Sequence, residues 1–270
     1  MNDKKMIVVD LDGTLLNINQ ECSKKTKKYL KKLKSLGYII VIATGRILKS
    51  AVDVTDGADF ANYIICSSGA LIYDIDNYKV IKKDDIFKED MRRICSYYNE
   101  DIDYINMCDM FYYHRYMDDS GRDIFFDRKI NDIDRFIDNS EDILHMIVKF
   151  KNNDLADKYS KLFKSDNLEI LIMQDSFNDR KWIEIFSKDV SKYNAIKVIM
   201  ELESISNDSV ISFGDGLNDV DMIKLCGIGV AMGNALDDVK AVSDYVTISH
   251  NRDGVIYFLK KYIEENNLVS

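Results

Sequence analysis

Three short apolar runs, each ending abruptly at a polar loop, constrain the fold of this chain most strongly. They are Met6–Val9, Tyr38–Ala43 and Tyr63–Cys66. Short continuous apolar runs are typical of strands buried on both faces, as in a parallel sheet. Between the first two runs, residues 23–36 carry apolar side chains at helical spacing. The order strand, helix, strand therefore predicts a doubly wound α/β fold with a parallel sheet.

An α+β pattern in the middle of the chain predicts a second domain. The stretch is rich in charge and tyrosine and lacks the glycine-ended strands of the first part. Its expected elements are strands over 143–150 and 168–173 and a helix over 154–164. The α/β pattern then returns, with a helix over 191–203 and strands over 209–213 and 228–230. We therefore expect a discontinuous core, residues 1–82 and 183–270, with an α+β cap domain inserted at 83–182.

Composition excludes several classes of protein. The net charge of −9 over 270 residues argues against a nucleic-acid groove, because phosphate backbones repel an acidic surface. The five cysteines show no metal-type pairing, as expected in a reducing compartment. The N-terminal apolar run has only four residues, too few for a signal peptide or a membrane span. We therefore expect a cytoplasmic protein with no membrane partner; composition leaves the oligomeric state open.

Two carboxylates follow the first apolar run. Asp10 and Asp12 are two residues apart at the end of an expected strand, so their side chains point to the same side of the sheet. Carboxylates held this close repel each other unless a cation or a proton lies between them. An acidic turn that merely caps the loop is the simpler interpretation. The carboxyl ends of strands in open α/β sheets are where ligands bind, so the position favours a functional site.

A second acidic cluster follows a later expected strand. Asp215, Asp219 and Asp221 lie within seven residues, beside Gly214 and Gly216. An oxygen-only cluster suits a hard cation, and Mg²⁺ needs only a few carboxylates together with waters and a phosphate. A glycine turn before an aspartate-rich helix N-terminus, favoured by the helix dipole, would also explain the cluster. Combined with the first pair of acids, the cluster indicates a magnesium site.

Four motifs, in this order, resemble those of the haloacid dehalogenase superfamily of phosphohydrolases. They are Asp10-Leu11-Asp12-Gly13-Thr14, Thr44-Gly45-Arg46, Lys192, and Gly214-Asp215-Gly216-Leu217-Asn218-Asp219. The resemblance is greatest to the Cof-like branch, whose cap is inserted between the second and third motifs, and it covers the expected core. Further agreement lies in residues 66–70, 230–235 and 253–255. The chain departs from the pattern at Ser68, usually asparagine, and at Tyr193, usually glycine. The resemblance implies a Rossmann-like core and a cap that determines substrate specificity.

The resemblance also implies roles for the residues of the site. Asp10 is the nucleophile and forms an aspartyl phosphate. Asp12 protonates the leaving oxygen and later accepts a proton from water. Mg²⁺ is held by Asp10, Asp215 and the main-chain carbonyl of Asp12. Thr44 donates a hydrogen bond to a phosphoryl oxygen, and Lys192 supplies positive charge.

Other residues of the motifs are expected around these. Gly45 and Asn218 are expected near the phosphate, and Asp219 is expected to orient metal-bound water or Lys192. Arg46 has two interpretations that the sequence leaves open, a substrate contact or a surface ion pair. Thr44 has a second interpretation as the cap of the helix that follows it.

The cap offers candidates for substrate recognition but no catalytic residue. The segment Phe111–Tyr116 combines aromatic side chains with an arginine, which suits sugars or phosphates, yet a half-buried strand explains the same alternation. Residues 174–180 form a second candidate loop. His114 and His145 are expected to be structural.

We therefore predict a Mg²⁺-dependent phosphatase acting on a small phosphorylated metabolite, a sugar phosphate or a cofactor phosphate. A phosphomutase on the same core is the first alternative. A phosphoacceptor signalling domain is less favoured, because such domains need no inserted cap. A non-catalytic binding protein is less favoured still, because every motif residue is present. The sequence does not define the physiological substrate.

Overall fold

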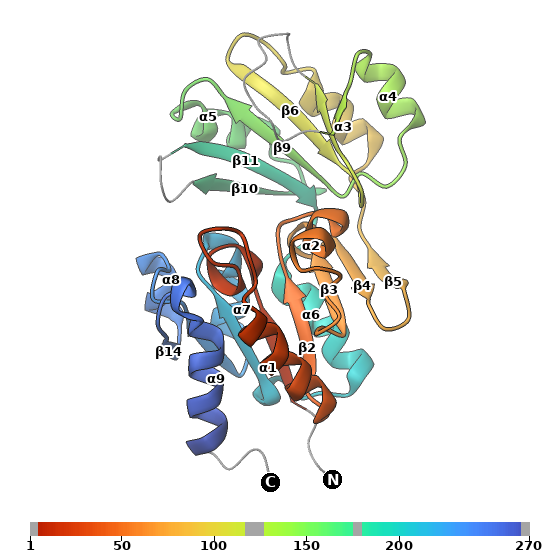
Figure 1. Ribbon diagram of the computed structural model, residues 1–270. Coiled ribbons are helices and arrows are strands. Elements are labelled where there is room, and N and C mark those ends of the chain that lie inside the picture. The colour runs from red at the N-terminus through yellow and green to blue at the C-terminus, as the bar shows by residue number, and fades with distance from the viewer. Residues whose placement is uncertain (1–4, 117–126, 175–179, 266–270) are drawn as a thin grey trace. The chain divides into compact units, whose positions relative to one another are not determined.

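The computed structural model describes residues 5–116, 127–174 and 180–265 and divides into two compact units (Figure 1). The first unit comprises Met1–Lys82 and Ser191–Ser270, and the second comprises Lys83–Val190. No helix among the described residues is long and apolar enough to cross a membrane.

The first unit is built on a sheet that has eight strands within the described residues, in the order β14-β13-β12-β1-β2-β3-β4-β5. The strands are β1 Met6–Val9, β2 Ile39–Ala43, β3 Tyr63–Cys66, β4 Leu71–Asp74, β5 Lys79–Lys83, β12 Val210–Gly214, β13 Ile228–Ala231 and β14 Tyr245–Val246. Every neighbouring pair from β14 to β3 is parallel, and β4 pairs antiparallel with β3. The predicted α/β fold with a parallel-rich central sheet is confirmed.

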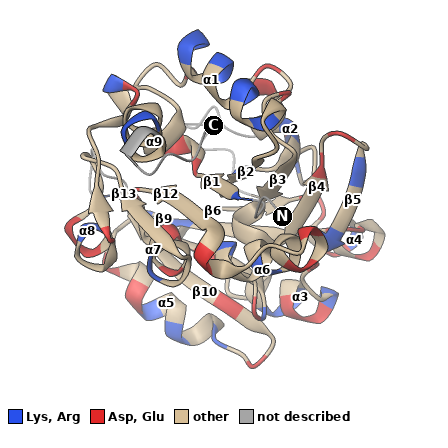
Figure 2. Ribbon diagram, turned by 90° about the horizontal axis from the view of Figure 1, so that it is seen from below, with Lys and Arg blue, Asp and Glu red and all other residues tan. Residues whose placement is uncertain are grey.

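Helices cover both faces of this sheet. They are α1 Lys24–Ser35, α2 Leu48–Val54, α6 Lys192–Glu203, α7 Val220–Leu225, α8 Asp237–Val242 and α9 Gly254–Glu265. Figures 1 and 2 show α1 and α9 on one face and α6 and α7 on the other. The Oγ atom of Ser23 accepts a hydrogen bond from the main-chain N–H of Thr26 and caps α1, whose Leu30 and Leu33 are buried. A sheet covered on both faces explains why β1, β2 and β3 are continuous apolar runs.

The second unit is a six-stranded sheet, within the described residues, with helices on one face. The strand order is β10-β11-β9-β6-β7-β8. The strands are β6 Ile102–Cys108, β7 Tyr113–Tyr116, β8 Arg128–Lys129, β9 His145–Phe150, β10 Leu168–Gln174 and β11 Lys181–Ser187, and the helices are α3 Lys88–Cys95, α4 Ile133–Asn139 and α5 Leu155–Phe163. Because β11 pairs with β9 and β10, this unit continues to Val190, beyond the boundary at 182 that the sequence pattern suggested.

One hydrophobic core joins the sheet of the second unit to its helices. Alternate residues of β9, Met146, Val148 and Phe150, face this core. On the helix side, Phe163 of α5 is fully buried and its ring lies 5.6 Å from that of Tyr159. Period-two burial on the strands and helices on a single face are the α+β arrangement expected from the sequence.

Two candidate segments of this unit have different outcomes. Residues Tyr113–Tyr116 of the segment 111–116 form β7, and the side chains of His114 and Arg115 are buried. Of the loop 174–180, residues 175–179 lie outside the described residues. His145 is buried at the start of β9 and its ring stacks on that of Phe186, as expected of a structural histidine.

Replacing Phe163 by alanine tests the core of the second unit. Phe163→Ala removes a fully buried ring, and we expect a loss of about 3–5 kcal/mol in the free energy of unfolding. The neighbouring Leu162 has 41% of its surface exposed, and Leu162→Ala should change the free energy by only about 0.5 kcal/mol. Urea unfolding followed by the fluorescence of Trp182, the chain's one tryptophan and a residue of β11, measures both. Equal losses in the two variants would contradict this packing.

Candidate active site

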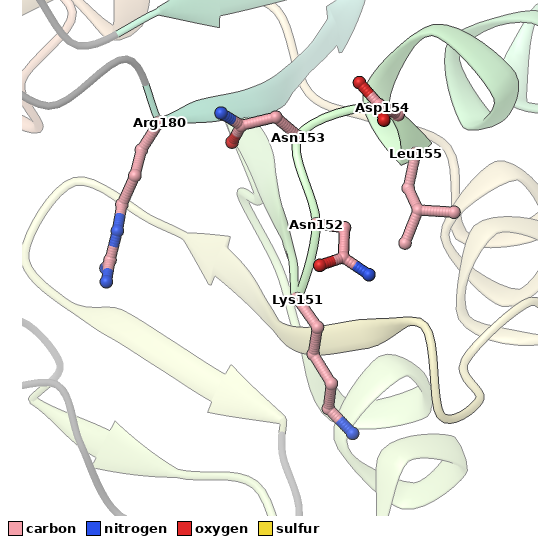
Figure 3. A pocket seen from close by; sticks show the side chains of 6 residues that line it. All are labelled: Lys151, Asn152, Asn153, Asp154, Leu155 and Arg180. Atoms are coloured by element: carbon pink, nitrogen blue, oxygen red, sulfur yellow. The ribbon is translucent and has the colours of Figure 1, made fainter.

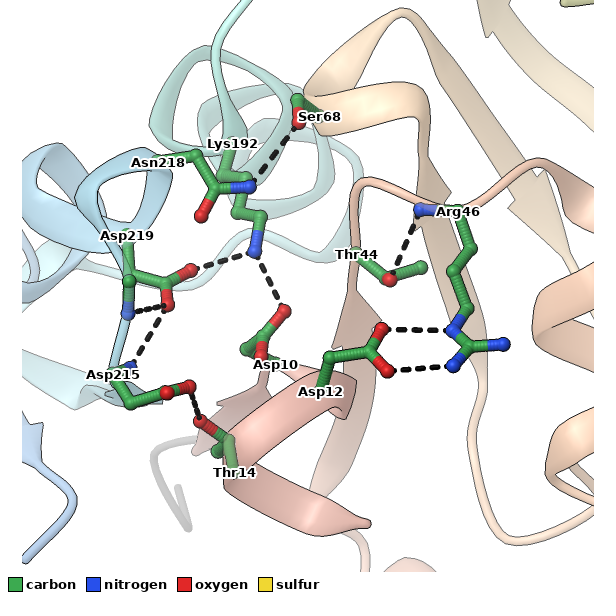
Figure 4. Close-up of polar contacts among 11 residues, drawn as sticks. Asp10, Asp12, Thr14, Thr44, Arg46, Ser68, Lys192, Asp215, Asn218 and Asp219 are labelled. Atoms are coloured by element: carbon green, nitrogen blue, oxygen red, sulfur yellow. Dashed lines mark hydrogen bonds and ion pairs between the residues drawn. The ribbon is translucent and has the colours of Figure 1, made fainter. Parts of the chain in front are cut away.

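The site forms where three adjacent strands of the first unit end. Asp10 directly follows β1, Thr44 follows β2 and Asp215 follows β12, with β1 lying between the other two strands (Figure 4). The main-chain N–H of Asp10 donates to the carbonyl oxygen of Phe213 over 3.0 Å, which extends the β1–β12 pairing to Asp10 itself. Parallel strands therefore bring three side chains, far apart in sequence, to one edge of the sheet.

Lys192 lies buried between two of the acids. Its Nζ atom donates to Asp10 Oδ1 over 2.7 Å and to Asp219 Oδ1 over 2.6 Å, and its side chain has no exposed surface. The residue begins α6, where Ser191 accepts a hydrogen bond from the main-chain N–H of Asn194 and caps the helix. A buried ammonium needs such partners, because an unpaired charge in the interior is strongly unfavourable.

Gly13 allows the first motif to approach the second. Its φ of +78° lies in the left-handed region, and a Cβ atom there would lie 2.2 Å from Asp215 Oδ2. Thr14, the next residue, donates from Oγ1 to Asp215 Oδ1 over 2.9 Å. Only glycine satisfies both the backbone conformation and the close approach of Asp215.

Asp219 holds its surroundings in place with both carboxylate oxygens. Oδ1 accepts from Lys192, while Oδ2 accepts from the main-chain N–H groups of Asp215 and Gly216 over 2.9 and 3.0 Å. The side chain is 1% exposed. Asp219 therefore links the ammonium of Lys192 to the loop that carries Asp215.

Burial and neighbouring acids raise the pKa values of two acids of the site, Asp10 and Asp215. Burial raises the pKa of Asp10 well above its ordinary value, and the nearby carboxylates add to this while Lys192 opposes it. Burial and repulsion from Asp219 raise the pKa of Asp215 to about 7. For Lys192, burial alone would lower the pKa, but Asp10 and Asp219 outweigh it and leave the pKa raised. The site therefore holds more negative charge than its ammonium balances.

Three acids present a cluster of oxygens that fits a metal ion. One carboxylate oxygen from each of Asp10, Asp215 and Asp219 lies within 4.8 Å of the other two. Both oxygens of Asp219 accept hydrogen bonds of 3.0 Å or less, whereas Asp10 and Asp215 each accept one of that length at a single oxygen, so these two have the greater freedom to act as ligands. Two carboxylates with remaining positions for water and phosphate suit a small, hard divalent cation.

The side chain of Asp12 is directed away from this cluster and toward Arg46. The guanidinium donates from Nε to Oδ2 over 2.7 Å and from Nη2 to Oδ1 over 2.6 Å. The side chains of Asp12 and Arg46 are 45% and 25% exposed, and exposed pairs of this kind typically contribute about 0.2–1 kcal/mol. Of the two interpretations of Arg46, the described contacts show the ion pair.

The remaining predicted residues lie around Thr44. Its side chain is buried, and its Oγ1 accepts from the main-chain N–H of Arg46 over 3.2 Å. Asn218 donates from Nδ2 to Ser68 Oγ over 3.4 Å. A Cβ atom on Gly45 would lie 3.5 Å from that hydroxyl and 3.7 Å from Asn218 Nδ2. The side chains predicted to contact phosphate therefore lie together on the first unit.

Sequence reasoning did not assign roles to three residues of this site. Asn234 donates to the carbonyl of Gly13 over 2.8 Å, Gln20 accepts from Arg46, and Ser68 accepts from Asn218. Asn234 and Ser68 lie in segments that resemble the family, which was the available signal. Gln20 lies in a polar loop, and nothing in the sequence distinguishes it.

A surface hollow of about 510 Å³ lies in the second unit and contains none of the predicted catalytic and metal-binding residues, but it is lined in part by Arg180 of the candidate loop 174–180 (Figure 3). It is formed by the loop from β9 to α5 together with Arg180. Its lining is Lys151, Asn152, Asn153, Asp154, Leu155 and Arg180.

Comparison with known proteins decides the family. The family model of haloacid dehalogenase-like hydrolases matches residues 7–259. This chain belongs to that family. Two curated relatives, both from Bacillus subtilis, are named as 5-amino-6-(5-phospho-D-ribitylamino)uracil phosphatases. YcsE is 27% identical and matches 97% of this chain and 96% of its own length; YitU is 28% identical and matches 95% and 97%.

Solved structures of the family agree in fold. A haloacid dehalogenase-like hydrolase from Bacteroides thetaiotaomicron superimposes with a TM-score of 0.78 at 22% identity, covering 96% of this chain and 99% of that one. The family match and the curated phosphatases together confirm the predicted resemblance and the prediction of a phosphatase enzyme.

The raised pKa of Asp215 predicts a pH-dependent response to Mg²⁺. Because the folded pKa of about 7 exceeds the ordinary 3.8, the metal-free protein should lose stability as pH rises between these values. A divalent cation relieves the repulsion, so added MgCl2 should raise Tm more at about pH 8 than at about pH 6. Differential scanning fluorimetry at matched ionic strength measures the shift.

The Asp215→Asn variant is the matched control. It removes one negative charge while keeping an oxygen that can accept from Thr14, so its Tm should respond less to MgCl2 at either pH. A shift that is equal at both pH values in the native chain would contradict the electrostatic account.

Proposed function

We propose that this chain is a Mg²⁺-dependent phosphatase that hydrolyses a small phosphorylated metabolite through an aspartyl phosphate on Asp10. One observation carries the proposal: a buried carboxylate at the end of the central strand β1 is paired with the ammonium of Lys192 and lies beside the carboxylate of Asp215. A nucleophile held in this way can accept a phosphoryl group whose charge the cations of the site offset.

Asp10 and Lys192 act together in the first half of the reaction. A bond forms between a carboxylate oxygen of Asp10 and phosphorus as the ester P–O bond breaks on the opposite side. Lys192 fixes the orientation of the carboxylate and reduces its repulsion of the incoming phosphate. Thr44, Gly45 and Asn218 provide hydrogen bonds or space for the phosphoryl oxygens.

Asp12 moves the protons of both halves. In the first half its carboxyl group gives a proton to the leaving oxygen. In the second half its carboxylate accepts a proton from the water that attacks phosphorus, and the P–O bond to Asp10 breaks. The proton regained in the second half replaces the one given in the first, so the cycle balances.

The oxygens of Asp10 and Asp215, together with the main-chain carbonyl of Asp12, would hold Mg²⁺. When bound, Mg²⁺ supplies positive charge that neutralises the transferred phosphoryl group. The donor set fits because it is made only of oxygens and because the site has excess negative charge. Asp219 supports the set by holding Lys192 and the Asp215 loop.

The names of the relatives bear on the substrate. Both Bacillus subtilis relatives are named as phosphatases of a ribitylaminouracil phosphate, an ester of a small polyhydroxylated chain. This supports a small sugar-like or cofactor-type phosphate for the present chain. We further propose that the second unit, as the cap of the family, determines which of these is accepted.

A phosphate-release screen with and without Mg²⁺ tests the function. The native chain should release phosphate from at least one sugar or cofactor phosphate only with the metal. Asp10→Asn should lower turnover by at least about 10³-fold, because it removes the nucleophile. The variant should still fold, because Lys192 retains Asp219 as a partner.

The exposed Asp59, paired with Lys31, provides the control Asp59→Asn, which should keep native turnover. Native turnover in Asp10→Asn would contradict the mechanism. Formation of an isomeric phosphate ester without phosphate release would instead identify a phosphomutase.

A further inference from the structure

The guanidinium of Arg46 occupies both oxygens of Asp12. Its Nε and Nη2 atoms donate to Oδ2 and Oδ1 over 2.7 and 2.6 Å and form a bidentate ion pair (Figure 4). Charge-assisted pairs of this geometry fix direction as well as distance. The side chain proposed to carry protons at the reacting centre is therefore held by a residue of the neighbouring strand end.

Other contacts fix Arg46 in this position. Its Nη1 donates to Ser50 Oγ over 3.1 Å, and Nη2 also donates to Gln20 Oε1 over 2.5 Å. Its main-chain carbonyl accepts from the N–H of Ser67 over 2.9 Å, next to the loop that carries Ser68. All three guanidinium nitrogens therefore have protein acceptors. These contacts hold the guanidinium in the orientation that faces Asp12.

The side chain of Asp12 cannot keep this position throughout the reaction if it transfers protons. To give a proton to a leaving oxygen or take one from water, Asp12 must offer an oxygen to that group. With both oxygens accepting from Arg46, neither is aimed at Asp10. At least one of the two hydrogen bonds must therefore open during the reaction.

We propose that Arg46 is a positioning residue: when the phosphate of the substrate draws one of its N–H groups away, the remaining hydrogen bond orients the released Asp12 carboxylate toward the reacting centre. The inference rests on the proposed phosphatase function. A phosphate monoester dianion accepts hydrogen bonds from a guanidinium as a carboxylate does, and it carries more negative charge than a carboxylate. The pair is accessible to this exchange, because both side chains are partly exposed. Substrate binding and release of Asp12 thus become one event.

A double-mutant cycle separates this role from simple phosphate binding. Arg46→Met keeps most of the side-chain volume and removes the guanidinium group. If Arg46 acts through Asp12, Arg46→Met should lower kcat about tenfold or more in the native chain. In an Asp12→Asn background the same substitution should change kcat less than about twofold, because the group it positions is already inactive.

A lysine substitution distinguishes loss of the bidentate contact from loss of the positive charge. Arg46→Lys keeps the positive charge but cannot make the bidentate contact with Asp12. We expect it to restore KM toward the native value while kcat stays near that of Arg46→Met. Arg252→Met, at an exposed arginine of the same unit, should leave kcat and KM at native values, and circular dichroism checks that each variant folds.

The outcomes separate the two proposals. If the native chain releases no phosphate, or if Asp10→Asn keeps native turnover, the proposed function fails. If the function holds but Arg46→Met causes the same fold loss in both backgrounds, or changes only KM, the positioning role alone is overturned. A kcat restored by Arg46→Lys would also overturn it.

Discussion

The buried ammonium of Lys192 is the interaction on which the rest of the site depends. It joins Asp10 at the end of β1 to Asp219 beyond β12, and it is separated from Asp10 by 182 residues in sequence. Removing one partner of a buried ion pair typically costs about 3–5 kcal/mol, because the other charge is left uncompensated. The second unit lies in the sequence between these residues, so the same contact joins the two chain segments that make up the first unit.

Charge balance explains why this arrangement suits phosphoryl transfer. When all four acids are ionised, four carboxylates face two cationic side chains, which leaves two negative charges. The carboxylates are those of Asp10, Asp12, Asp215 and Asp219, and the cations are those of Lys192 and Arg46. A divalent cation would supply this charge; in its absence, burial and the neighbouring acids raise the pKa values of Asp10 and Asp215. The same excess of acid that disfavours the metal-free site therefore favours binding of a divalent cation.

The sequence predicted the parts of the fold that have a simple hydrophobic pattern. The strands Met6–Val9 and Tyr63–Cys66 match the structure residue for residue, because continuous apolar runs have sharp ends. It did not predict β5, whose run Lys79–Lys83 is mostly charged and partly exposed, or the two-residue β14. The pattern also placed the end of the insertion at residue 182, inside β11, since the pairing of a strand with β9 and β10 is not visible in its own sequence.

The sequence predicted which residues lie together in the candidate site, but not the contacts among them. Strand-end position and motif order pointed to Asp10, Thr44 and Asp215, because parallel strands bring their carboxyl ends together. Lys192 is one of 37 basic residues, and only the tertiary fold shows that it is buried between two acids. The sequence left Arg46 open between substrate and ion pair, since the choice depends on how a loop directs its side chain.

The central claim is that Asp10 carries the phosphoryl group, and trapping it is the most direct measurement. The enzyme is mixed with a phosphate-labelled substrate and Mg²⁺, quenched in acid within one turnover and digested for peptide mass spectrometry. The account predicts a labelled phosphoryl group on the peptide that contains Asp10, and none in Asp10→Asn. Phosphate release without label on Asp10, or label on another residue, would contradict it.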